Sequence, residues 1–135
     1  MTTVYKVAES GADYKRVHAL IKAENVENAD KLSFPTIMAM DDESGECVGC
    51  LGTNTEQGMI IAGPLVIKQD RRRTHTIIRL VEAYEAVMRH CKIKSFIFSA
   101  KADDEQWLRY IDEVLGFTPY YKDDAYAWFV WKLKE

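Results

Sequence analysis

Seven stretches of the chain have alternating or continuous apolar residues, which predict strands, and three others have the 3.6-residue period of a helix. The predicted strands cover residues 2–7, 35–40, 46–53, 59–68, 94–100, 117–121 and 126–133. The predicted helices cover residues 11–25, a long stretch through 77–91, and a stretch from Asp103 or Asp104 to Leu115. This order of elements predicts an α/β (α+β) fold in which helices cover the faces of one mixed sheet.

Terminal signals support the helices. Ser10 and Asp13 form a capping-box pattern, with Asp in place of the usual Glu. Gly116 stands where a glycine commonly ends a helix. The middle helix has one apolar stripe, formed by Ile77, Val81, Tyr84, Met88 and Cys91. We therefore expect Cys91 to lie in the core.

Polar turns at residues 41–45 and 54–58 join the central strands into an antiparallel meander. Between the first helix and the meander, residues 26–32 predict a loop or a short helix. Gly63 and Pro64 interrupt the last strand of the meander. Because proline cannot donate a ladder hydrogen bond, we expect a bulge or a local separation of strands there.

The chain has 135 residues, of which 47% are hydrophobic and 29% charged, and this predicts one globular domain, residues 1–135. That composition excludes disordered, collagen-like and disulfide-scaffold proteins. The net charge of −3 argues against a dedicated nucleic-acid-binding protein. We see no apolar run long enough to span a membrane and no signal peptide, so we expect a cytoplasmic protein.

The three cysteines fit free thiols in a reducing compartment. Cys47 and Cys50 have the spacing of a redox pair, but the flanking residues predict a strand, whereas a redox pair usually lies at a helix start. A zinc site would need two more ligands at metal spacing, and the sequence offers none. We expect two half-buried strand cysteines and no metal.

The most informative junction joins an apolar strand, a short basic turn and the long helix, over residues 65–77. A helix start has N–H groups without intrahelical acceptors and a partial positive charge. Here three arginines and two threonine hydroxyls accompany it, a combination that suits a pyrophosphate. The alternative is a solvated basic loop in which Thr74 or Asp70 caps the helix.

At this junction the sequence resembles the GNAT N-acetyltransferase superfamily, in which R/Q-x-x-G-x-G/A joins an apolar strand to a long helix. Arg71 matches the opening basic residue, whereas Thr74 and Thr76 replace both glycines. Downstream, Leu115-Gly116-Phe117 matches the end of the family motif F-Y-x-K-L-G-F. The family order of elements also matches, from Val4 to Leu133.

The resemblance implies a V-shaped separation of the fourth and fifth strands that holds acetyl-CoA or CoA. Backbone groups of Leu65, Val66 and Ile67 would bind the pantetheine and polarise the thioester carbonyl. The pyrophosphate would be held by Arg71, Arg72, Arg73, Thr74, His75 and Thr76. Because His75 lies near a helix start, we expect it to be a surface residue and not a catalytic one.

The residues that usually act as base and acid in this family are replaced, since Ala62 stands at the usual Glu and Asp112 at the usual Tyr. Tyr110 is about 200° around a helix from Asp112, so we expect it to point elsewhere. The candidates for catalysis are Asp112, Tyr120 and Glu56, followed by Glu46, Tyr121 and His18. For Asp112, a carboxylate on the surface of its helix is the favoured alternative to a base.

Two functions remain open. The first is an acetyltransferase that modifies an amine of a small molecule or a protein. The second is a scaffold without catalysis that binds a partner protein, in resemblance to short bacteriophage-encoded members of the family that act on host proteins. Nucleic-acid binding through the arginine cluster is the less favoured third. Among the C-terminal aromatic residues we expect most in the core and one or two at an interface, such as that of a homodimer.

Overall fold

The computed structural model describes residues 2–26, 32–56, 58–71 and 74–134, apart from the side chains of Glu56 and Thr74. The strands are β1 (Thr3–Val7), β2 (Ser33–Asp41), β3 (Cys47–Glu56), β4 (Met59–Ile67), β5 (Ser95–Lys101), β6 (Thr118–Lys122) and β7 (Tyr126–Lys132). The helices are α1 (Gly11–Ala23), α2 (Thr74–His90) and α3 (Glu105–Tyr110), with a 3₁₀ turn η1 (Gln69–Arg71) and a π turn η2 (Ile111–Leu115). This order confirms the predicted α/β architecture.

Within the described residues the strands form one mixed sheet in the order β1-β2-β3-β4-β5-β7-β6. Neighbouring strands from β1 to β4 are antiparallel, as the predicted meander requires. β4 and β5 run parallel, and α2 is the crossover between them. The last two strands form the predicted hairpin, with β7 next to β5 and β6 at the sheet edge.

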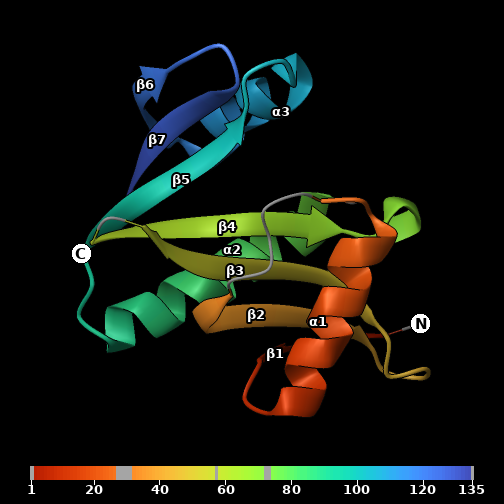
Figure 1. Cartoon of the computed structure of the whole chain (residues 1–135). Coiled ribbons are helices and arrows are strands. Elements are labelled where there is room, and N and C mark those ends of the chain that lie inside the picture. The colour runs from red at the N-terminus through yellow and green to blue at the C-terminus, as the bar shows by residue number, and fades with distance from the viewer. Residues whose placement is uncertain (1, 27–31, 57, 72–73, 135) are drawn as a thin grey trace.

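The two long helices cover opposite faces of the meander, with α1 in front of the sheet and α2 behind it in Figure 1. On the α1 face, Val17, Leu20 and Ile21 pack with apolar residues of β2, β3 and β4. On the α2 face the fully buried side chains include Leu80 and Tyr84. Burial of a side chain of this size contributes about 1.5–3 kcal/mol, so these two helices fix the sheet from both sides.

The predicted cap of α1 is confirmed. Ser10 Oγ accepts the N–H of Asp13 at 3.1 Å, and the Asp13 carboxylate accepts the N–H of Glu9 at 3.0 Å. Lys6 Nζ lies 3.1 Å from the same carboxylate. The hydrogen bond from Glu9 and the charge of Lys6 lower the pKa of Asp13 although its burial opposes this.

The aromatic residues near the C-terminus divide between core and surface. Trp131 is buried and stacks on Phe117 at a centroid distance of 4.5 Å, and its Nε1 donates to Glu85 at 2.8 Å. Tyr120 and Tyr121 on β6 are exposed. Phe129 is also buried, whereas Tyr126 and Trp128 are half-buried, so fewer of these aromatic residues lie in the core than expected.

Three further expectations were wrong in detail. Cys91 is exposed, because α2 ends at His90 and the apolar stripe stops with the helix. Cys47 and Cys50 are fully buried and not half-buried. The predicted turn at 54–58 is shorter, because β3 extends to Glu56 and pairs with β4 as far as Met59. Residues 27–31 of the predicted loop lie outside the described residues.

Candidate functional site

A bulge deforms β4 at the predicted position. Leu51 pairs with Leu65 and Thr53 pairs with Ala62, so the two residues Gly63 and Pro64 lie opposite a single residue of β3. Gly63 has a φ of +142°, a backbone conformation that favours glycine. Asn54 Nδ2 donates to the carbonyl oxygen of Gly63 at 2.8 Å, which satisfies a backbone group that the bulge removes from the ladder.

Directly before this bulge the parallel ladder between β4 and β5 ends. In the described residues the ladder consists of two pairs, Ile61 with Ile97 and Ala62 with Phe98. Beyond these pairs the two strands diverge toward the ends that lead to α2 and α3 (Figure 1). We call this region, where β4 and β5 separate after Ala62 and Phe98, the β4–β5 splay.

The hydrogen bonds to β3 show which backbone groups of β4 face the splay. Lys68 N donates to Val48 O at 2.8 Å, so this pair is hydrogen-bonded in the antiparallel register. Hydrogen-bonded pairs alternate along an antiparallel ladder, so the backbone groups of Val66 point to Cys50 on β3. The backbone groups of Leu65 and Ile67 therefore point to the opposite edge, toward the splay.

After β4 the chain makes η1 and then enters α2 at Thr74. The first N–H groups of a helix have no intrahelical acceptor. In this first turn His75 is exposed and Thr76 is buried. The predicted pyrophosphate residues Arg72 and Arg73, and the side chain of Thr74, lie outside the described residues.

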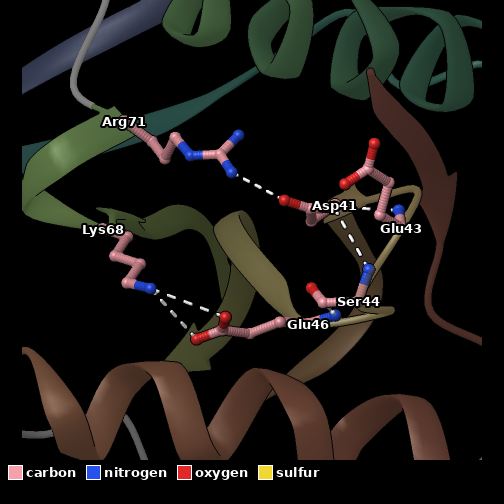
Figure 2. A network of polar contacts seen from close by, with 6 residues as sticks. All are labelled: Asp41, Glu43, Ser44, Glu46, Lys68 and Arg71. Atoms are coloured by element: carbon pink, nitrogen blue, oxygen red, sulfur yellow. Dashed lines mark hydrogen bonds and ion pairs between the residues drawn. The ribbon is translucent and has the colours of Figure 1, made fainter. Parts of the chain in front are cut away.

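Arg71, the residue that matches the opening of the family motif, lies in an ion pair. Its Nη2 is 2.6 Å from Oδ2 of Asp41, and both side chains are largely buried, with 18% and 7% exposed (Figure 2). The other oxygen of Asp41 accepts the N–H groups of Glu43 at 2.9 Å and Ser44 at 3.2 Å. These hydrogen bonds, from Ser44 first, and the Arg71 guanidinium hold the pKa of Asp41 below its usual range.

Asp41 was not identified from the sequence. It opens an Asp-Asp-Glu-Ser-Gly turn, and such a pattern indicates local hydrogen bonds to the backbone. It does not indicate an arginine 30 residues away.

The candidate acids and bases are spread over the surface. Asp112 is exposed on η2, Tyr120 and Tyr121 are exposed on β6, and His18 is exposed on α1. Glu46 pairs with Lys68 at 3.3 Å, and the side chain of Glu56 lies outside the described residues. Ala62, at the position of the usual family base, is fully buried and packs in the α2-face core.

Tyr110 is connected to the β4–β5 splay through two ring contacts. Its ring stacks on Trp107 at a centroid distance of 5.4 Å, and Trp107 meets the edge of Phe98, which ends the β4–β5 ladder. The Tyr110 hydroxyl is buried and has no hydrogen-bond partner among the residues that the structure describes. Burial raises the pKa of this hydroxyl, so it keeps its proton at neutral pH.

Two cavities lie away from the splay. The larger, of about 700 Å³, is lined by Val7, Ala8, Glu9, Tyr14, Phe34, Ala86, Val87 and His90. The smaller, of about 360 Å³, lies on β6 and β7 and is lined by residues that include Tyr120, Tyr121 and Trp128. In the described part of the chain no cluster of His, Cys, Asp or Glu could hold a metal ion, and no helix is long and apolar enough to cross a membrane.

The sequence matches no protein-family model and no curated protein. Solved structures nevertheless share the fold over nearly the whole chain. PaiA N-acetyltransferase from Thermoplasma acidophilum, solved with coenzyme A, has a TM-score of 0.76 at 10% identity and covers 98% of this chain and 100% of its own. YncA from Salmonella typhimurium, solved with acetyl-CoA, has a TM-score of 0.73 at 10% identity, with coverages of 100% and 96%.

The NatC complex, solved with Gag peptide and CoA, includes a chain with a TM-score of 0.69 at 18% identity, with coverages of 99% and 100%. At such low identities the likeness concerns the fold. The β4–β5 splay is the separation of the fourth and fifth strands that the sequence resemblance implies. The chain therefore has the fold of the GNAT N-acetyltransferases, the family that its strand–helix junction resembles.

Proposed function

We propose that the protein is an acyltransferase that moves an acetyl group from acetyl-CoA to an amine. The observation that carries this proposal is the β4–β5 splay. The ladder ends after Ala62, and the register of β4 on β3 directs the backbone groups of Leu65 and Ile67 toward the region that the ladder leaves. Backbone N–H groups in this position suit the polarisation of a thioester carbonyl, which needs no particular side chain.

The residues present fit an elongated anionic cofactor. Leu65 and Ile67 would bind the pantetheine, with Val66 held against β3 between them. The pyrophosphate would be held at the start of α2 by Arg72, Arg73, Thr74, His75 and Thr76, which follow the paired Arg71. Threonine at two glycine positions adds bulk near a phosphate, and its hydroxyl offers a hydrogen bond in exchange.

Acetyl-CoA, when bound, supplies the activated acetyl group as a thioester. The neutral amine attacks its carbonyl carbon, a C–N bond forms, and the C–S bond breaks. The amine gives up one proton, and the leaving thiolate takes one. We propose Tyr110 as the proton donor to the thiolate, because its hydroxyl is protonated, buried and two ring contacts from Phe98. Asp112, Tyr120 and Glu56 remain the candidates for the base.

Thermal unfolding with and without acetyl-CoA tests the binding step. At a ligand concentration of about 100 times Kd, the free energy of unfolding should rise by roughly 2.7 kcal/mol, and the Tm by several degrees. The paired change Arg71→Ala, Arg72→Ala should reduce this shift. Release of CoA is then measured with polyamines, amino acids, aminoglycosides and peptides as acceptors. The proposal fails if millimolar acetyl-CoA leaves the Tm unchanged and no acceptor releases CoA.

A second candidate function is binding of a partner protein. It is supported by the side chains of Tyr120 and Tyr121, which are 65% and 59% exposed on an edge strand and line a groove with Trp128. Tyrosine and tryptophan are enriched at protein interfaces. A pull-down with the wild-type chain should then capture a specific protein, and the paired change Tyr120→Ser, Tyr121→Ser should abolish capture while Asp112→Ala leaves it intact. Equal capture by all three proteins would count against this function.

A further inference from the structure

Two ion pairs connect the turn between β2 and β3 with residues 68–71, which we call the β4–α2 segment. Arg71 pairs with Asp41, and Lys68 pairs with Glu46 (Figure 2). The two pairs differ in exposure. The side chains of Lys68 and Glu46 are 38% and 55% exposed, so that pair contributes little. The largely buried pair of Asp41 and Arg71 is therefore the one that can fix the segment.

The two carboxylate oxygens of Asp41 bind different partners. Oδ1 accepts two N–H groups of its own turn, so the carboxylate is held rigidly by the backbone. Oδ2 then holds the guanidinium of Arg71 at 2.6 Å. A carboxylate anchored in this way holds the guanidinium in a defined position, and removal of Asp41 or Arg71 would leave the other buried charge without this ion pair. The turn is therefore joined to Arg71, the last residue of η1.

This position matters because η1 ends at Arg71 and α2 begins at Thr74. A shift of the guanidinium would move the start of α2, where the N–H groups proposed to bind pyrophosphate lie. The same geometry disfavours a direct contact of Arg71 with a phosphate. A phosphate on this guanidinium would come close to the negative carboxylate of Asp41, and like charges repel. The side chain of Arg71 also has only 18% of its surface exposed.

We propose that Asp41 is a positioning residue for cofactor binding, and that Arg71 acts through its ion pair with Asp41 and not as a phosphate ligand. This inference rests on the proposed function and names the residue that positions the site for the phosphates of the cofactor. Asp41 sets the affinity for the phosphate-bearing half of the cofactor, and it contributes nothing to the acetyl–pantetheine half.

The test measures the affinity of CoA by titration calorimetry for the wild type, Asp41→Asn, Arg71→Gln and the double variant. Because the pair acts as one unit, we expect Kd to rise roughly tenfold in each single variant and by the same factor in the double variant. Affinity for S-acetylpantetheine, which has no phosphate, should stay the same in all four proteins by NMR titration. A general loss of structure would instead lower the affinity for both CoA and S-acetylpantetheine.

Asp42→Asn is the matched control, because it removes one negative charge from the same turn at an exposed side chain. We expect its CoA affinity to equal that of the wild type. Hydrogen exchange without ligand should be faster for the amides of residues 69–71 in Asp41→Asn and unchanged in Asp42→Asn.

Two results would overturn the inference while leaving the proposed function intact. One is tighter CoA binding by Asp41→Asn, which would mean that Arg71, once released, binds phosphate directly. The other is unchanged CoA affinity in Asp41→Asn. If the wild type itself does not bind CoA, the proposed function fails and this inference fails with it.

Discussion

The hydroxyl groups of Thr53 and Tyr84 lie 2.6 Å apart in the core between β3 and α2. Thr53 donates its single hydroxyl proton to the carbonyl of Pro35 at 2.7 Å, so Tyr84 is the donor in the contact with Thr53. Both side chains are almost fully buried. The chain of hydrogen bonds therefore connects α2 to both β3 and β2.

Tyr84→Phe should lower the free energy of unfolding by about 1–2 kcal/mol, because Thr53 loses its donor in a buried site. Tyr5→Phe is the matched control. The Tyr5 hydroxyl is buried and has no hydrogen-bond partner in residues 2–26, 32–56, 58–71 or 74–134, so its loss should change stability by less than about 0.5 kcal/mol. Urea unfolding measures both. Equal effects of the two changes would contradict this account.

The burial of the Tyr84 hydroxyl predicts a loss of stability at high pH. Burial raises the pKa of Tyr84 to about 12, from near 10 in an unfolded chain. Since the folded state favours the protonated hydroxyl, its contribution is complete below pH 10 and declines as the pH rises toward 12. Urea unfolding between pH 9 and 12 should therefore show a smaller decline for Tyr84→Phe than for the wild type. A parallel decline in both proteins would argue against this assignment.

The three thiols should differ in reactivity. Burial raises the pKa of the Cys47 thiol to about 11 and raises that of Cys50 as well, whereas Cys91 is exposed. At pH 8, Ellman's reagent should modify one thiol in the native protein and all three in guanidinium chloride. Cys91→Ser should abolish the native reaction. Rapid reaction of two or more thiols in the native wild type would show that β3 is accessible from the α1 face.

The lowered pKa of Asp41 predicts a loss of stability in acid. The N–H groups of Ser44 and Glu43, together with Arg71, lower the pKa of Asp41 below the ordinary 3.8. A carboxylate with a lowered pKa stabilises the fold fully above the unfolded-state pKa and loses this contribution as the pH falls through the folded-state pKa. The difference in Tm between wild type and Asp41→Asn should therefore be constant from pH 8 to 5 and shrink below pH 3.8. A difference that already shrinks between pH 7 and 5 would point to another titrating group.

Local signals predicted the fold well. Ser10 and Asp13 cap α1, Gly116 ends η2 with a φ of +71°, and Gly63-Pro64 deforms β4, each through interactions within a few residues. Periodicity was less reliable at element ends. It extended the apolar stripe of α2 to Cys91, one residue past the end of the helix.

The site was predicted less completely, because its contacts join distant parts of the chain. The resemblance gave Leu65, Val66 and Ile67 as a group, and only the register against β3 separates Val66 from its two neighbours. No local pattern connects Asp41 with Arg71. Ala62 is buried in the core, so its alignment with the usual base says nothing of how this chain would move a proton.

Tyr110→Phe tests the proposed proton donor with a readout that packing alone would not give. The Tyr110 hydroxyl lacks a hydrogen-bond partner in the described part of the chain, so its removal should leave the Tm unchanged or slightly higher. If it protonates the leaving thiolate, kcat should fall by roughly 10²–10⁴-fold while the KM for acetyl-CoA stays the same. Tyr120→Phe and Asp112→Asn, at exposed positions, test the other candidates in the same assay. An unchanged kcat in Tyr110→Phe would rule out Tyr110 as the proton donor, and a large loss of kcat in Asp112→Asn or Tyr120→Phe would identify the base.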